Sequence, residues 1–83
     1  MSNNQKNLDS ISSPRFLLAL QGLNRILGHS MVEMLILDLE RQGIMLHGNE
    51  RYCIKQVEHA LVSTFGSEGG TLLAEKLRKA LDL

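Results

Sequence analysis

Apolar residues recur at the spacing of an α-helix with one buried side along most of the chain. Between residues 16 and 27 they form a single stripe of Phe16, Ala19, Leu20, Leu23, Ile26 and Leu27. Ser13 and Pro14 precede this stripe and predict a helix start, because serine accepts hydrogen bonds from free amides and proline is tolerated in the first turn. Gly28 predicts the end of this helix in a left-handed conformation.

A second helix is predicted to begin at Ser30, which has the spacing of a capping box with Glu33. Gly43 is predicted to end it. This segment is apolar on most of its sides, so we expect it to be the central, largely enclosed helix.

A third helix is predicted from Asn49, as its cap, to Gly66, and a fourth from Ser67 to Leu81. No segment shows sustained alternation, so strands are not expected beyond two or three residues of the connector at 44–49. The fold class predicted is therefore all-α, a compact four-helix domain over residues 13–83. Residues 1–12 are polar with little periodicity and predict a disordered N-terminal tail.

Composition and charge indicate the size of the fold and the kinds of partner that the chain can bind. The chain has 83 residues, of which 43% are hydrophobic, and this suits one small globular domain. Nine basic residues balance nine acidic ones, which argues against a nucleic-acid or membrane partner because such binding rests on positive charge. One cysteine, no signal-peptide pattern and no long apolar run predict a cytoplasmic protein.

The chain offers few groups for metal binding or catalysis. The candidate ligands are Cys53, His29, His47 and His59, and none of them has the tight spacing of a zinc site. Cys53 and His59 form the one nucleophile and base pairing to consider, and they project apart on a helix. We therefore expect no catalytic residue, no metal and no cofactor, and we interpret the chain as not an enzyme.

The glycine-rich segment "FGSEGGTLL", residues 65–73, has two interpretations. A phosphate-binding loop would need a GK[ST] ending after a strand, and neither is present. Gly70 falls on the apolar side of the last predicted helix. We therefore interpret the segment as a helix junction, where the missing side chain lets this helix lie close against a neighbour.

The distribution of leucines points to protein contacts. Five apolar residues fall outside the main stripes, namely Leu17, Leu18, Leu37, Val62 and Leu72. Self-association as a symmetric homodimer would cover some of them. The main interpretation is a non-catalytic protein–protein interaction or dimerisation domain, and a small-ligand sensor with a pocket between helices is a further alternative.

DNA binding is the sharper alternative. The turn at Gly28–Ser30 lies between two predicted helices, as in a helix-turn-helix. The helix after it carries core-type residues rather than the arginine, asparagine or glutamine that read bases. This alternative is therefore a small transcriptional regulator that contacts DNA through Lys76, Arg78 and Lys79 near the C-terminus.

From Leu27 to Leu81 the chain resembles a small all-helical domain family of archaea. The matching features are the "LG" turn, a helix ending in "LERQGI", a helix ending in "FG", and a glycine-started last helix with "LL". Members of that family occur alone or as output domains of two-component signalling proteins. The resemblance implies a cytoplasmic signalling or regulatory role and assigns no site residue.

Overall fold

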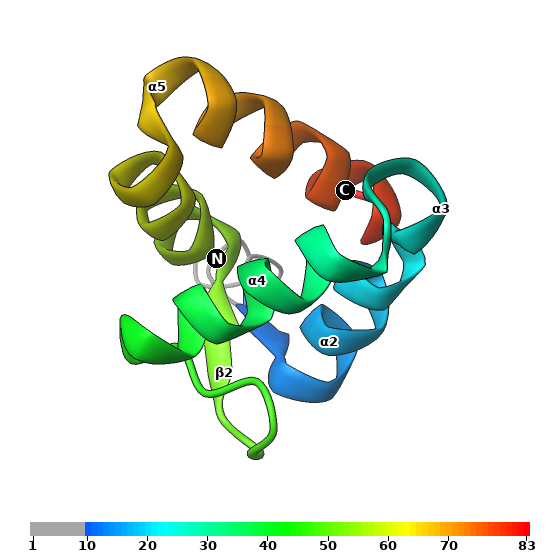
Figure 1. The fold of residues 1–83 in the computed structure, drawn as a ribbon. Helices are drawn as coiled ribbons and strands as arrows, with labels where there is room; N and C mark the ends of the chain where they lie inside the picture. The colour runs from blue at the N-terminus through cyan, green and yellow to red at the C-terminus, as the bar shows by residue number, and fades with distance from the viewer. Residues whose placement is uncertain (1–9) are drawn as a thin grey trace.

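The computed structural model describes residues 10–83 as a mainly helical domain with one small sheet (Figure 1). The elements are β1 (Ser10–Ser12), α2 (Ser13–Gly22), α3 (Asn24–Leu27), α4 (His29–Arg41), β2 (Arg51–Cys53) and α5 (Ile54–Ala80). The helical character is as predicted. The prediction of four separate helices is wrong, because within residues 10–83 only α2, α4 and α5 exceed a single turn.

The predicted third and fourth helices are the two halves of α5, which bends at Gly66 (Figure 1). Gly66 has φ 85° and ψ 169°, which is not a helical conformation, so α5 has a kink at this residue. The second half then folds back towards the first. A Cβ atom on Gly70 would lie 2.6 Å from the backbone nitrogen of Val62, so the close approach predicted at Gly70 is confirmed.

Strands β1 and β2 pair antiparallel, with Ser10 opposite Cys53 and Ser12 opposite Arg51. Ile11, between them, is buried. The Arg51 guanidinium strengthens the pairing by donating to the hydroxyl of Ser10 at 2.9 Å and to its carbonyl at 2.6 Å. The sequence prediction is therefore wrong for residues 10–12, which were placed in a disordered tail, and for residues 51–53, which were placed in a helix. The rest of the predicted tail, residues 1–9, lies outside the described residues.

The helix starts also differ from prediction. Ser12, not Ser13, is the N-cap of α2, Gly28 is that of α4, and Cys53 is that of α5. In place of the predicted Asn49 cap, the Gln56 side chain accepts a hydrogen bond from the Cys53 amide at 2.9 Å. The predicted glycine stops do occur, because Gly28 and Gly43 have φ 90° and 95° at the ends of α3 and α4.

The Ser13 hydroxyl is fully buried and joins the start of α2 to the loop between α4 and β2. It lies 2.8 Å from the carbonyl oxygen of Met45 and 3.0 Å from that of Glu50, to which it can donate. Ser13 therefore holds the connector in place rather than capping its own helix.

Replacing Ser13 with alanine should destabilise the domain by about 1–2 kcal/mol, because a buried carbonyl loses its donor. The matched control is Ser12→Ala, since the Ser12 side chain makes no cap hydrogen bond, and its effect should stay within about 0.5 kcal/mol. Urea denaturation followed by circular dichroism measures both changes. Equal losses for the two variants would contradict the bridging role of Ser13.

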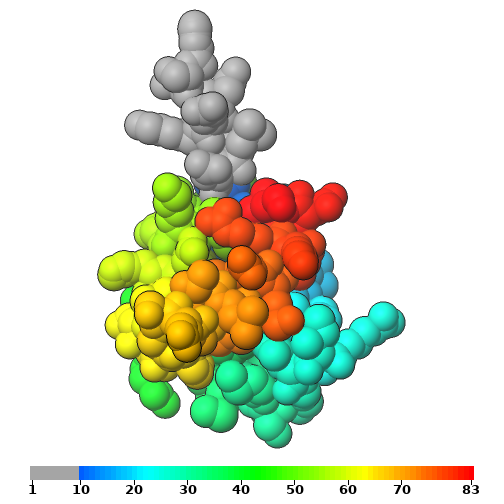
Figure 2. Space-filling model, turned by 90° about the horizontal axis from the view of Figure 1, so that it is seen from above, coloured from blue at the N-terminus to red at the C-terminus, as the bar shows by residue number. Residues whose placement is uncertain are grey.

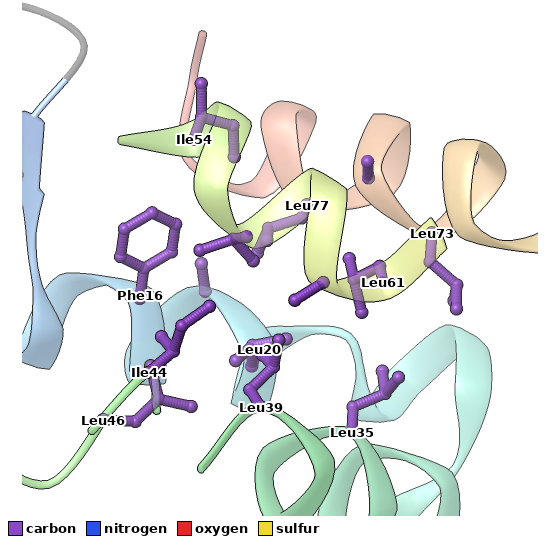
Figure 3. Close-up of a cluster of buried hydrophobic side chains, with 14 of the residues drawn as sticks. Phe16, Leu20, Leu35, Leu39, Ile44, Leu46, Ile54, Leu61, Leu73 and Leu77 are labelled. Atoms are coloured by element: carbon purple, nitrogen blue, oxygen red, sulfur yellow. The ribbon is translucent and has the colours of Figure 1, made fainter. Parts of the chain in front are cut away.

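The core lies between α2 and α4 on one side and the two halves of α5 on the other (Figure 3). Its largest fully buried side chains include Phe16, Leu20, Leu35, Leu39, Leu61 and Leu77. The Arg15 guanidinium donates to the carbonyl of Leu81 at 2.8 Å, which fixes α2 against the end of α5. The first and last helices of the described chain are therefore held together.

Candidate interaction site

Helix α4 buries one face and presents apolar side chains on the other. Val32, Leu35 and Leu39 lie in the core, whereas Met34 and Leu37 are 59% and 58% exposed. Positions three apart are neighbours on a helix surface, so Met34 and Leu37 form one patch. The prediction that this helix is enclosed on most sides is therefore wrong, and its outer apolar face is left without a partner within residues 10–83.

A groove of about 590 Å³ lies between α2 and α4 on this side of the molecule. Its apolar lining includes Leu17, Ile36 and Leu37, and Glu33 and Glu40 also line it. Two histidines pair with these carboxylates. His29 Nε2 lies 3.1 Å from Glu33 Oε2, and His47 Nδ1 lies 2.6 Å from Glu40 Oε2.

A smaller hollow of about 200 Å³ continues this surface onto α5. Met34 and Leu37 line it from α4, and Phe65 lines it from the last turn before the α5 bend. Leu37 belongs to both hollows, so they form one surface. We call this surface the α4 face; it consists of Leu17, Met34, Ile36, Leu37 and Phe65, with Glu33 and Glu40 at its edge.

A hydrogen-bonded cluster holds α4 and α5 together beside the α4 face. The Gln42 amide donates to Asp38 Oδ2 and to Thr64 Oγ1, both at 2.9 Å. The Thr64 hydroxyl donates to the same Asp38 oxygen at 2.6 Å. This cluster fixes the end of α4 against the first half of α5, so that Phe65 stays beside Leu37. Sequence reasoning missed it, because its members lie up to 26 residues apart.

A second groove, of about 480 Å³, lies between α3 and the C-terminal half of α5. We call it the α5 groove. Its exposed apolar residues are Ile26 and Leu72, at 62% and 55% exposure, and Lys76 and Lys79 line it on the α5 side. In Figure 2 the C-terminal half of α5, in orange, lies beside the cyan segment that contains α3.

The predicted basic cluster of Lys76, Arg78 and Lys79 is divided in the structure. Lys76 and Lys79 line the α5 groove. Arg78 is turned away towards the first half of α5, where its guanidinium lies 2.9 Å from Glu58 Oε1. Only two of the three predicted DNA-contacting side chains therefore share one groove.

The five predicted interface residues lie in four places. Leu17 and Leu37 both line the α2–α4 groove, and Leu72 lines the α5 groove. Leu18 is 69% exposed on α2 and lines neither groove. Val62 is half-buried where the two halves of α5 meet at Gly70. Sequence reasoning did not select Ile26, Met34, Ile36 or Phe65 as interface residues, because their spacing also suits a core stripe.

Of the four candidate metal ligands, His29 and His47 line the α2–α4 groove, whereas Cys53 and His59 lie elsewhere. Cys53 ends β2, and His59 is exposed in the first half of α5 beside Lys55 and Gln56. Among residues 10–83 no group of three or more histidine, cysteine or acidic side chains could hold a metal ion together. None of the helices described here is long and apolar enough to cross a bilayer.

Comparisons with protein families, with curated proteins and with solved structures found no match to this chain. Its function is therefore inferred from the surface of the molecule and from the residues that form it.

Proposed function

We propose that this chain is a non-catalytic protein–protein interaction module that self-associates through the α4 face, with a homodimer as the smallest assembly. The observation that carries the proposal is the exposure of Met34 and Leu37, at 59% and 58%, on the outer side of a helix whose inner side fills the core. Single exposed apolar residues are normal on proteins. Met34 and Leu37, however, line one hollow together with Phe65, and such clustering is typical of contact sites.

Burial of this surface would supply useful binding energy. Fully covering a leucine or methionine side chain contributes about 1.5–3 kcal/mol. The cluster of Asp38, Gln42 and Thr64 fixes α4 against α5, so little backbone freedom is lost when the α4 face binds. A preorganised apolar patch of this kind is well suited to a reversible protein contact.

The proposed role is regulatory and cytoplasmic. Its support is the resemblance of residues 27–81 to archaeal output domains of signalling proteins, together with a surface adapted to contact rather than to chemistry. The rival proposal is a transcriptional regulator that contacts DNA through Lys76, Arg78 and Lys79. The pairing of Arg78 with Glu58 weakens this rival, and salt-dependent binding to random duplex DNA would favour it.

Light scattering coupled to size exclusion tests self-association. We expect a wild-type mass that rises above one chain as the concentration enters the micromolar range. Leu37→Glu should remain a single chain, because the carboxylate would lose its hydration among the apolar side chains of the contact. We expect its dissociation constant to rise by at least about 100-fold, which corresponds to about 2.7 kcal/mol.

The matched control is Leu18→Glu, which introduces the same charge at a residue that is 69% exposed on α2 and lies outside both grooves. It should associate like the wild type. A wild-type chain that stays monomeric at every concentration would contradict the proposal. So would a Leu37→Glu variant that is folded by circular dichroism and still associates normally.

A further inference from the structure

The α4 face carries acidic groups at its edge. Glu33 and Glu40 are seven residues apart on α4, which places them about two turns or ~10 Å apart along the groove. Both line it together with Leu17, Ile36 and Leu37. The smaller hollow of the α4 face is lined by Asp38 and Arg41, whose opposite charges offset each other. Each glutamate also lies beside a histidine, but among the described residues no lysine or arginine lines the α2–α4 groove, so the α4 face is apolar and acidic.

The α5 groove has the opposite character. Lys76 and Lys79 lie one turn apart and line it together with the exposed apolar residues Ile26 and Leu72. Glu75 also lines the groove, so two positive charges face one negative charge. This groove is apolar and basic, and it lies on a different part of the molecule from the α4 face.

The two surfaces therefore complement each other in charge, whereas neither complements itself. If two α4 faces met, the glutamates of both copies would enter the same interface, and like charges brought together oppose binding. If an α4 face met an α5 groove, Glu33 and Glu40 of one copy would lie opposite Lys76 and Lys79 of the other. Leu37 would then enter a groove that already contains Ile26 and Leu72.

We propose that the α4 face of one copy binds the α5 groove of a second copy, so that the chain associates head to tail. This inference rests on the proposed function, since it names the surface to which the α4 face binds. A head-to-tail contact uses different patches on the two copies, so each dimer keeps one free α4 face and one free α5 groove. Association then continues until a ring closes or an open fibre forms.

Two variants that each block one surface test this arrangement. Leu37→Glu blocks the α4 face and leaves the α5 groove intact, and Leu72→Glu does the reverse. Each variant alone should have the mass of one chain. An equimolar mixture should have the mass of two chains and no more, because only one productive contact can form between the two variants. Light scattering and sedimentation velocity both measure this.

A symmetric contact gives a different result. In that case Leu72→Glu alone associates like the wild type and the mixture forms no dimer of the two variants, which would overturn the head-to-tail inference and leave the proposed function standing. A wild-type chain that never associates would instead refute the proposed function itself. Ile26→Glu, at a residue that is 62% exposed, serves as a second block of the α5 groove if Leu72→Glu does not fold.

The charges provide an independent readout. The double variant Lys76→Glu, Lys79→Glu should weaken association by at least about tenfold, and raising the salt concentration should weaken wild-type association by screening the pairs. Mixing this double variant with Glu33→Lys, Glu40→Lys should restore association, because each α4 face then finds an α5 groove of opposite charge on the other variant. Association that is insensitive to both salt and the lysine substitutions would contradict the charge pairing.

Discussion

Replacing Gly70 with alanine is expected to destabilise the domain by on the order of 2 kcal/mol, although alanine normally favours a helix over glycine. The added Cβ would lie 2.6 Å from the backbone nitrogen of Val62 and 2.8 Å from the carbonyl carbon of Leu61. Backbone atoms cannot rotate aside, so the two halves of α5 would have to separate. Leu73 and Leu77, which are buried just beyond Gly70, would then lose contacts.

The neighbouring glycine provides a matched control with the opposite sign. A Cβ on Gly69 would meet only the Cβ of Phe65, at 3.5 Å, which is an ordinary contact. Gly69→Ala should therefore stabilise the domain by about 0.5–1 kcal/mol, by restricting the unfolded chain. Guanidinium denaturation compares the two variants, and equal shifts in midpoint would contradict the close approach at Gly70.

Replacing Leu20 with alanine should cost about 2–5 kcal/mol, because it leaves a cavity in the centre of the core. Leu20 is 1% exposed and lies among the buried side chains shown in Figure 3. In a domain of this length each kcal/mol lowers the melting temperature by roughly 4–8 °C. The variant should therefore melt at least about 8 °C below the wild type in a calorimetric scan.

Leu18→Ala makes the same change two residues earlier in α2. Leu18 is 69% exposed, so the free energy of unfolding should change by no more than about 0.5 kcal/mol. The difference between the two variants measures burial alone, since helix propensity is altered equally. Similar melting temperatures for both would contradict the position of Leu20 in the core.

Local signals in the sequence were sufficient to locate the helices and several of their ends. Gly28 and Gly43 could be predicted as helix ends because glycine, which has no Cβ, adopts a left-handed conformation without steric cost. The pairing of Ile11 with Tyr52 and the bridge from Ser13 to Met45 could not be predicted. These contacts join residues more than 30 positions apart, and no short-range periodicity encodes such a partner.

The candidate surface could be predicted only in part, for a related reason. Leu17 and Leu37 lie outside their helical stripes and were predicted to face outward. Met34 is not among the predicted interface residues, because the segment is apolar on most sides and its pattern does not indicate which side is exposed. Which side of such a helix stays exposed depends on where α2 and α5 pack against it, and this arrangement is set by tertiary structure alone.

The hydrogen bond from Arg15 to the Leu81 carbonyl, at 2.8 Å, has a consequence for folding during synthesis. Helix α2 packs against α5, and both Leu77 and Leu81 are buried in the core. A nascent chain emerging from the ribosome can pack α2 against α4, but the core around Phe16 and Leu20 stays incomplete until α5 has been made. Domains fold as units when their parts are available together, so this one is expected to fold only once residue 81 has emerged, rather than helix by helix.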